Sequence, residues 1–232
     1  YASPVRALGL VGEYSSDTTV SAMSAFLSAL RAKGINATAD GRALAPEGAA
    51  VVATFDDNTL GDAVELMLRV SENNVAEILF RQVALARGYP ATWSSSASAA
   101  REALSDLGID TAPLRLKDGS GLSQADRLTA RTLSDVLDRV VNGDYPALAP
   151  IMNALPIAGE TGTLTYRFTG QASCARDKVF AKTGSLTGVN TLAGLTKGAD
   201  GTWKSFAIMV NDAPWSTSPG IDVLAATVNG CL

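Results

Sequence analysis

The sequence predicts a mixed α/β protein, in which several helices come first and are followed by a small antiparallel sheet and one closing helix. Two patterns support this fold class. Apolar residues recur at helical spacing up to about residue 141, and after Pro156 they alternate with polar residues or form short runs separated by glycine. The chain has 232 residues, of which 47% are apolar, so it is long enough to bury a core. Length alone fits one domain, or one and a fraction.

Five segments in the first part carry apolar residues every three or four positions, as an amphipathic helix does. Residues that favour helix caps precede some of these segments, and glycine follows others, which marks their ends. The predicted helices cover about residues 20–30, 60–68, 75–83, 97–107 and 128–141. The first of them belongs to a lead-in segment, residues 1–50. The polar sequence Ser71-Glu72-Asn73-Asn74 forms a short junction between the second and the third.

Three short apolar runs in the last part predict strands. They cover residues 178–182, 189–195 and 205–211, and the first strand is expected to end at Thr183-Gly184. The gaps between the runs are short and contain glycine, so the strands should pair as an antiparallel meander. Residues 163–168 also alternate, which favours an extended segment, and residues 219–228 predict the closing helix.

Charge and hydropathy argue against two classes of partner. The net charge is −4 and the sequence contains no cluster of Lys and Arg, so we expect no binding to nucleic acid or to an anionic membrane surface. No apolar run approaches the roughly 20 residues that a membrane-spanning helix needs. We therefore expect no membrane span.

The chain contains no histidine. This excludes Ser-His-Asp and Cys-His catalysis, and histidine-ligated zinc, within these residues. A hydroxyl nucleophile would need Lys, Tyr, a carboxylate or a water relay as its base. Lysine fits this role best, because burial and nearby cations can lower its pKa into the working range. We expect no metal or other cofactor.

Two interpretations of Cys174 and Cys231, which are the only cysteines, stay open. They are two unpaired buried thiols, or they form one disulfide in an exported protein and tie the C-terminus to the segment before Lys182. The chain begins with Tyr1 rather than Met, so we expect a processed or trimmed product.

The sequence Lys182-Thr183-Gly184-Ser185 follows directly on a predicted strand and carries the first candidate site. Gly184 lets a ligand lie close to the strand, while Thr183 and Ser185 offer hydroxyls. Lys182 offers a cation for a terminal carboxylate. Together they would receive an extended peptide that pairs as an added strand. Taken alone, Lys-Thr-Gly is also a common turn sequence.

A second candidate site is the Ser71-Glu72-Asn73 junction. Ser71 could relay a proton, and the amide of Asn73 could hold both a lysine and a substrate carbonyl. The alternative is a helix cap, because both residue types favour caps. Likewise, the sequence Asp-Gly-Ser-Gly-Leu-Ser at residues 118–123 can be read simply as a tight turn before a helix.

The ordered set of these motifs resembles the penicillin-binding D-Ala-D-Ala carboxypeptidase/endopeptidase family, the class C low-molecular-mass penicillin-binding proteins. The set consists of Ser-x-Asn from Ser71, the 118–123 sequence, Leu-Pro-x-Ala-Gly-x-x-Gly-Thr-Leu at residues 155–164, and Lys-Thr-Gly-Ser from Lys182. The resemblance runs from about Leu60 to the C-terminus and includes the flanking sequences.

The resemblance implies the serine β-lactamase/transpeptidase fold, an antiparallel sheet flanked by helices. It implies a peptidase in which the serine of a Ser-x-x-Lys motif attacks the penultimate D-Ala carbonyl of a peptidoglycan stem peptide, and in which β-lactams trap the same serine. Ser71 and Asn73 match the second family motif, and residues 182–184 match the third. Ser185 matches the hydroxyl that receives the substrate carboxylate.

No Ser-x-x-Lys occurs in the 232 residues. In the family this motif and the first strands lie upstream, so we expect the chain to be the C-terminal portion of a transpeptidase-like domain, with the fold incomplete. The nucleophile would come from an N-terminal portion of the same bacterial protein, exported to the periplasm or cell wall. The alternative is a catalytically inactive relative that binds peptidoglycan peptides or a protein partner. Endopeptidase action on cross-links is a further activity that the family allows.

Overall fold

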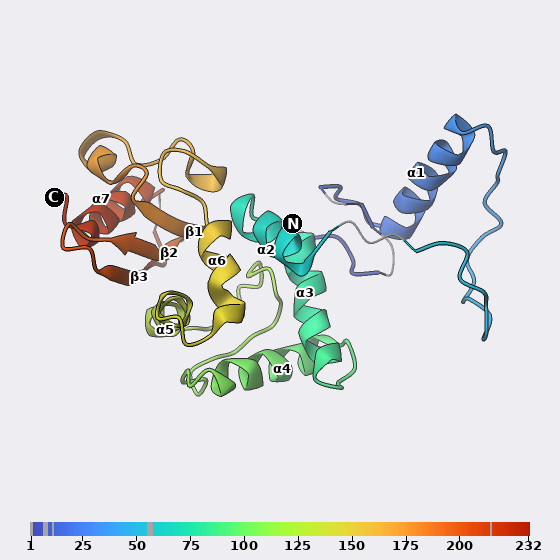
Figure 1. The fold of residues 1–232 in the computed structure, drawn as a ribbon, viewed down its shortest axis with the longest axis horizontal. Helices are drawn as coiled ribbons and strands as arrows, with labels where there is room; N and C mark the ends of the chain where they lie inside the picture. Colours follow the sequence, from blue (N-terminus) through green and yellow to red (C-terminus); the bar gives the residue numbers. More distant parts are fainter. Residues whose placement is uncertain (1, 7–8, 11, 55–57, 214) are drawn as a thin grey trace.

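The computed structural model describes residues 2–6, 9–10, 12–54, 58–213 and 215–232. Its first part is helical and its last part holds the sheet, as predicted (Figure 1). The α-helices are α1 (Thr18–Ala32), α2 (Leu60–Arg69), α3 (Asn73–Ala86), α4 (Trp93–Asp106), α5 (Ala130–Val141), α6 (Ala149–Ala154) and α7 (Ser218–Asn229). Short 3-10 helices are η1 (Pro146–Leu148), η2 (Gly162–Leu164) and η3 (Gly170–Ala175), and the strands are β1 (Val179–Leu186), β2 (Val189–Lys197) and β3 (Trp203–Val210).

Threonine caps fix the starts of three helices. The hydroxyls of Thr59, Thr92 and Thr129 accept hydrogen bonds from the backbone amides three residues further on, at 3.2, 3.2 and 3.1 Å. All five predicted helices of the first part are confirmed. α4 begins at Trp93, earlier than predicted, because Thr92 caps it. α6 was not predicted, since six residues are too few to reveal a helical period.

The three strands form one antiparallel sheet in the order β1-β2-β3, so the predicted meander is confirmed. The prediction that the first strand ends at Thr183-Gly184 is wrong, because β1 continues to Leu186. Gly184 pairs with Thr191, and a Cβ on Gly184 would collide with the Thr191 hydroxyl. The glycine therefore makes room for the Thr191 side chain and does not mark a turn.

The extended segment predicted for residues 163–168 is also wrong. The structure has the 3-10 helix η2 there, followed by a turn. Gly162 has φ of +57°, and the Thr165 hydroxyl donates a hydrogen bond to its carbonyl oxygen at 2.8 Å. Leu164 and Phe168 are fully buried four residues apart, so their burial comes from a compact loop and not from a strand.

Helices cover both faces of the sheet (Figure 1). On one face, α7 and η3 pack on a core cluster that includes Val179, Ala181, Leu192 and Phe206. On the other face, α5 and α6 contribute to a cluster with Leu137, Val140, Leu155 and Leu195. Alternate residues of β1 and β2 thus enter opposite layers, which gives the sheet two buried faces.

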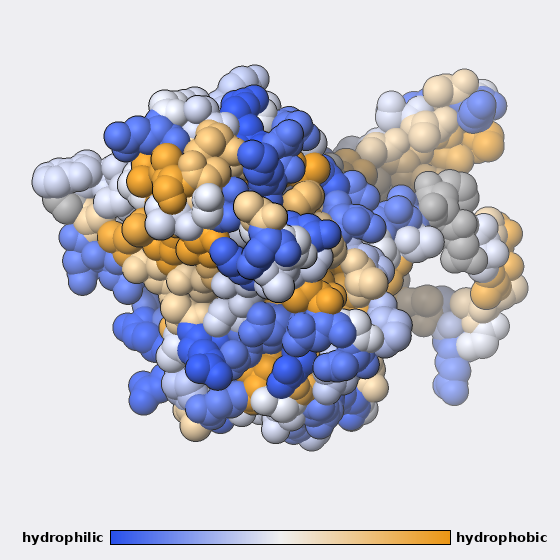
Figure 2. Space-filling model, turned by 60° about the vertical axis from the view of Figure 1, so that its left-hand side comes forward, coloured by the Kyte–Doolittle hydropathy of each residue, from blue (hydrophilic) through white to orange (hydrophobic). Residues whose placement is uncertain are grey.

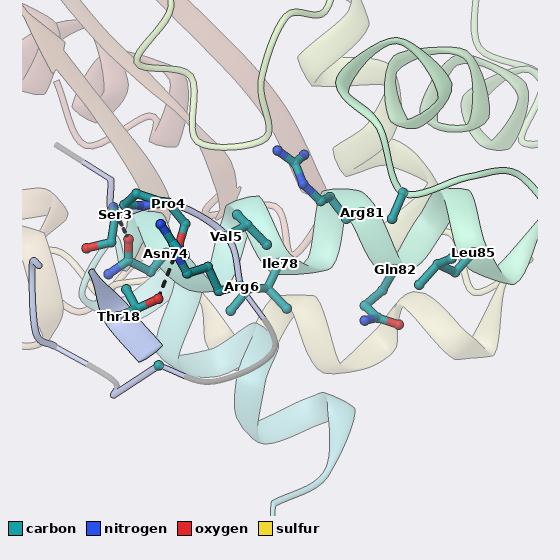
Figure 3. A pocket seen from close by; sticks show the side chains of 12 residues that line it. Ser3, Pro4, Val5, Arg6, Thr18, Asn74, Ile78, Arg81, Gln82 and Leu85 are labelled. Atoms are coloured by element: carbon teal, nitrogen blue, oxygen red, sulfur yellow. Dashed lines mark hydrogen bonds between the residues drawn. The ribbon is translucent and has the colours of Figure 1, made fainter. Parts of the chain in front are cut away.

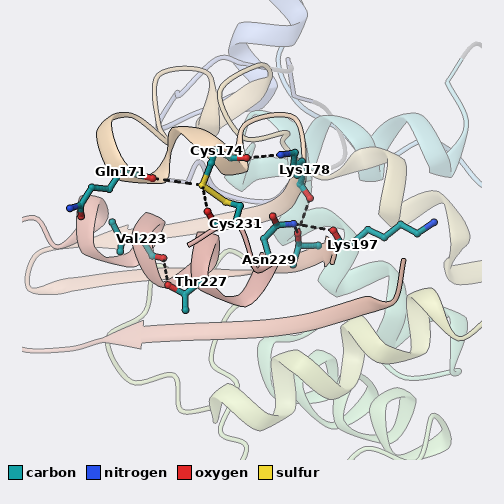
Figure 4. Close-up of a disulfide and its surroundings, with 9 residues drawn as sticks. Gln171, Cys174, Lys178, Lys197, Val223, Thr227, Asn229 and Cys231 are labelled. Atoms are coloured by element: carbon teal, nitrogen blue, oxygen red, sulfur yellow. Dashed lines mark hydrogen bonds between the residues drawn. A yellow bond between two sulfur atoms is a disulfide. The ribbon is translucent and has the colours of Figure 1, made fainter. Parts of the chain in front are cut away.

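A disulfide between Cys174 and Cys231 closes the C-terminal half (Figure 4). It joins η3 to the residues that follow α7, across 57 positions of sequence. Nearby, the Asn229 amide donates to the Thr196 hydroxyl at 2.8 Å and so ties the end of α7 to β2. Of the two interpretations of the cysteines, the paired one is therefore correct.

The lead-in segment stands apart from this body, with α1 at the far right of Figure 1. Thr18 is the one residue of α1 that is buried, and Val20 and Phe26 are exposed. Figure 2 shows apolar side chains on this projecting part. Among the described residues, no helix combines the length and the apolar character that crossing a membrane requires.

Candidate active site

The α2–α3 junction holds its serine in an uncommon backbone conformation. α2 ends at Arg69 and α3 begins at Asn73, and between them Ser71 has φ of +61°. Residues other than glycine rarely occupy this left-handed region unless their surroundings hold them there. The helix cap is Glu72, whose carboxylate accepts a hydrogen bond from the Asn74 amide at 3.1 Å. Neither Ser71 nor Asn73 is the cap residue of α3.

Lys182 reaches this junction from the sheet. Its Nζ donates a hydrogen bond to the Ser71 Oγ at 2.8 Å, although the two residues are 111 positions apart in sequence. The same Nζ donates to the backbone oxygen of Thr183 at 2.8 Å. The structure thus brings together the lysine of one predicted motif and the serine of the other.

Burial sets the protonation behaviour of Lys182. It lowers the pKa of the amine from 10.5 to about 8, because the charged form loses hydration. An amine with this pKa holds both protonation states in appreciable amounts near neutral pH. The pair can therefore pass a proton through the Ser71 hydroxyl, while the charged form can still attract an anion.

The outer edge of β1 is paired over only part of its length. The Ala158 amide donates to the Val179 oxygen at 2.9 Å, and the Ala181 amide donates to the Pro156 oxygen at 2.9 Å. The backbone hydrogen-bonding groups of alternate residues point to the same edge of a strand. Those of Thr183 and Ser185 therefore face the outer edge, as those of Val179 and Ala181 do. Among the described residues, no backbone group outside the sheet bonds to the backbone of these two, although the Thr183 oxygen accepts a hydrogen bond from the Lys182 amine. The edge is thus open beside Lys182.

The remaining predicted site residues surround this open edge. Thr183 and Gly184 are half-buried, and Ser185 is exposed. The Thr183 hydroxyl donates to the Thr163 hydroxyl at 2.9 Å. Asn73 is half-buried in the first turn of α3, two residues after Ser71. The contact predicted between Asn73 and a lysine stays a prediction.

The 118–123 sequence has a structural role that sequence reasoning missed. Glu77, buried on α3, accepts hydrogen bonds from the Gly119 and Ser120 amides at 3.1 and 2.9 Å. A Cβ on Gly119 would lie 2.5 Å from the Cβ of Phe80, so the loop backbone lies directly on the helix. An acidic residue among the apolar positions of the predicted 75–83 helix was the available signal for Glu77.

A separate hollow of about 370 Å³ lies between the N-terminal segment and α3 (Figure 3). Residues 3–6 line one side, and Ile78, Gln82 and Leu85 line the other. The Ser3 amide donates to the Asn74 side chain at 2.6 Å at one end. This hollow does not include Ser71 or Lys182, so it is distinct from the candidate active site.

Comparisons with known proteins agree on one family. The family model described as the D-Ala-D-Ala carboxypeptidase 3 (S13) family matches residues 10–228. Carboxypeptidase DacB of Mycolicibacterium smegmatis is 38% identical over 186 residues, which cover 79% of this chain and 40% of that protein. The chain therefore spans less than half the length of this curated relative.

Solved structures show the same fold. Penicillin-binding protein 4 (dacB) of Haemophilus influenzae, complexed with a β-lactam, superposes with a TM-score of 0.71 at 26% identity, over 94% of this chain and 52% of that one. TLA-3 extended-spectrum β-lactamase superposes with a TM-score of 0.55 at 16% identity, over 75% and 65%. The predicted β-lactamase/transpeptidase-like fold, with helices around an antiparallel sheet, is confirmed.

Proposed function

Because the chain belongs to the D-Ala-D-Ala carboxypeptidase 3 (S13) family, we propose that it forms part of the active site of a serine-type peptidase that removes the terminal D-Ala from peptidoglycan stem peptides. In this proposal residues 1–232 are the C-terminal portion of a transpeptidase-like, penicillin-binding domain, with residues 1–50 as its lead-in. The whole protein is exported and acts at the cell wall, and the Cys174–Cys231 disulfide supports this location.

The observation that carries the proposal is the Lys182–Ser71 contact of 2.8 Å beside an open strand edge. A peptidase needs a group that moves protons and a surface that orients an extended peptide. Here the Lys182–Ser71 pair can move protons, and the open edge of the strand that carries Lys182 can orient the peptide. This placement fits acyl transfer better than it fits a purely structural contact.

The geometry of β1 supports one mode of substrate binding. An extended stem peptide pairs with the backbone of Thr183 and Ser185 as an added strand. Its terminal carboxylate lies near the Lys182 cation and the hydroxyls of Thr183 and Ser185, which stabilise the negative charge. Gly184 has no side chain, so the peptide can lie close to the strand.

Proton transfer follows from the pair of side chains. An attacking serine gives its hydroxyl proton to the lysine of its own Ser-x-x-Lys motif and forms a bond to the carbonyl carbon of the penultimate D-Ala, and the C–N bond to the terminal D-Ala breaks. The leaving amine takes a proton from the Ser71 hydroxyl, and Lys182 replaces that proton. The Asn73 amide orients the lysine and the substrate carbonyl. Water then hydrolyses the acyl-enzyme.

No Ser-x-x-Lys occurs among the 232 residues, which supports a proposal in which the attacking serine lies outside them. We place it in an N-terminal portion of the same protein. Penicillins and other β-lactams would acylate the same serine, as the β-lactam complex of the Haemophilus influenzae protein suggests by analogy. Endopeptidase cleavage of cross-links is a second activity of the same chemistry.

The test uses the full-length protein. Incubation with a fluorescent penicillin should label one serine upstream of residue 1, identified by mass spectrometry, and a stem pentapeptide should release D-Ala. The Ser71→Ala and Lys182→Met variants should slow both reactions. A full-length protein that carries Ser-x-x-Lys upstream, yet neither labels nor releases D-Ala, would contradict the proposal.

One observation favours a second candidate function. The missing Ser-x-x-Lys is also expected of a catalytically inactive relative that binds stem peptides or a protein partner. Reading the complete gene separates the two functions, because the inactive relative has no such motif upstream. In that case a stem peptide should bind the full-length protein in calorimetry without being cleaved.

A further inference from the structure

The loop between α6 and β1 contacts both halves of the candidate site. We name four residues the brace: Asn153 in the last turn of α6, and Thr161, Gly162 and Thr163 in this loop. The three loop residues belong to the 155–164 motif, for which the proposed mechanism provides no role. The contacts of the brace give that motif a function.

On the serine side, the brace holds Arg69, the last residue of α2. The guanidinium donates to the Asn153 backbone oxygen at 2.6 Å and to the Thr161 hydroxyl at 3.1 Å. Thr161 is itself fixed, because its hydroxyl accepts a hydrogen bond from the Ile157 amide at 2.9 Å. Arg69 lies two residues before Ser71, so these bonds hold the end of the helix that leads into the serine.

Gly162 adds a steric contact on the same side. It has φ of +57°, and a Cβ at this position would collide with the backbone oxygen of Arg69. The brace thus touches the backbone of α2 as well as a side chain. Since Ser71 holds a left-handed conformation that is strained for a residue other than glycine, the junction needs such external support.

On the lysine side, the brace holds β1. The Thr163 hydroxyl accepts a hydrogen bond from the Thr183 hydroxyl at 2.9 Å. Thr183 is the neighbour of Lys182, and both side chains are half-buried. The strand that carries the lysine is therefore tied to the same short loop as the helix that precedes the serine.

These contacts close a ring. It runs from Ser71 to Lys182 through their 2.8 Å hydrogen bond, to Thr183, across to the brace, and back through Arg69 to Ser71. Each step is one hydrogen bond or a few residues of chain. A shift of the brace must therefore change the separation of the lysine and the serine.

We propose that the brace is a positioning element that sets the distance between Ser71 and Lys182. The inference rests on the proposed function, because the distance matters for proton transfer. Among the described contacts, the hydrogen bonds between the brace and the site run to Arg69 and Thr183 and not to Ser71 or the Lys182 amine, so the brace acts through those two neighbours. Displacements of about 1 Å by remote mutations can slow a reaction up to 100-fold, so the expected effect is large enough to measure.

The test compares hydroxyl variants of Thr163 in the full-length protein. Thr163→Val removes the acceptor at nearly constant volume, and Thr163→Ser keeps it. We expect Thr163→Val to lower kcat for D-Ala release about tenfold, with KM nearly unchanged. Thr163→Ser should remain within about twofold of the parent rate, as one retained hydrogen bond implies.

A matched control separates positioning from stability. Thr196 also carries a buried hydroxyl in the sheet, bonded to the Lys178 oxygen at 2.9 Å, and it lies outside the ring. Thr196→Val should lower Tm yet leave kcat and its pH profile unchanged at a temperature where the variant is folded. If Thr163→Val slows release no more than Thr196→Val does, or if Thr163→Ser does not restore the rate, the proposal is wrong.

A second readout does not depend on activity. The titration of Lys182 can be followed by NMR in protein labelled with ¹³C-lysine, with the signal assigned by its absence from a K182R variant. A loosened brace admits water, so Thr163→Val should raise the measured pKa toward 10.5 while Thr163→Ser does not. If Thr163→Val shifts the titration of Lys182 but the parent protein releases no D-Ala, the brace is supported and the proposed function is contradicted. If Thr163→Val leaves the titration unchanged, the proposal of the brace is wrong, whether or not the parent releases D-Ala.

Discussion

The two halves of the candidate site are built in different ways. Lys182 lies inside a strand that is paired with β2 over its whole length, in a half of the molecule that a disulfide closes. Ser71 lies between two helix ends, in a left-handed conformation, and depends on distant residues for its support. One half is fixed by regular structure and the other by a few tertiary contacts. Changes near Ser71 should therefore affect the geometry of the site more than equal changes in the sheet.

The largest effect should come from removing the lysine itself. Lys182→Met in the full-length protein should slow acylation by a fluorescent penicillin about 10³-fold, as the loss of a positioned proton donor typically does. Lys178→Met is the matched control, because Lys178 precedes the same strand and its Nζ bonds only to the Cys174 oxygen at 2.8 Å among the described contacts. Comparable slowing in both variants would show that charge near the strand, and not the Ser71 contact, matters.

Breaking the disulfide should lower stability without changing the site. A paired Cys174→Ser and Cys231→Ser variant should lose about 4 kcal/mol of unfolding free energy, the chain-entropy figure for a loop of this length. Urea denaturation measures this loss, and the rate of penicillin acylation in the folded range should stay within about twofold of the parent, because the cystine lies outside the ring of contacts. A large fall in that rate would mean that the sheet half is less rigid than its pairing suggests.

A methyl group in the brace should test the serine half directly. Gly162→Ala should cost about 3 kcal/mol, because it adds a collision with Arg69 to the strain of a positive φ. Gly170→Ala is the control for strain alone, since Gly170 has φ of +58° and no atom within 4 Å of an added Cβ, and it should cost about 1 kcal/mol. Both values come from urea denaturation, and equal losses would contradict the steric argument.

The smallest effect should appear in the pH dependence of stability. The native pKa of Lys182 is about 8 and its ordinary value is 10.5, so the unfolded chain binds more protons between these values. Stability should therefore rise with pH, by about 1 kcal/mol between pH 7 and 9. The measurement is the unfolding free energy of the parent minus that of Lys182→Met at each pH. A difference that stays flat or falls with pH would show that burial does not shift this amine.

The same contrast separates what the sequence could predict from what it could not. The meander, and with it the place of Lys182 in the sheet, follows from local alternation and glycine spacing, since strand pairing across short gaps is a local property. The 2.8 Å contact with Ser71 joins residues 111 positions apart, and periodicity carries no information on such distances. The sequence did not predict this contact; the order of motifs shared with a family indicated only that both residues belong to one active site.

The errors at Gly184 and at residues 163–168 have a common cause. In both places a glycine or a threonine takes part in a contact with a residue distant in sequence. Sequence patterns, which consider only neighbouring residues, indicate a turn or a strand for the same residue. Gly184 makes room for Thr191, and Gly162 makes room for Arg69. Glu77 was missed for a similar reason, because its role lies in the amides of a loop more than 40 positions away.

The partial cover on the outer edge of β1 also bears on solubility. An open strand edge is a template on which identical chains can stack and aggregate. Here residues 156–158 occupy the first part of that edge, and the Lys182 amine engages the Thr183 oxygen beyond it. What remains is too short for the edge of a neighbouring molecule to pair with at length. The same arrangement that leaves room for the end of a peptide thus protects this edge against self-association.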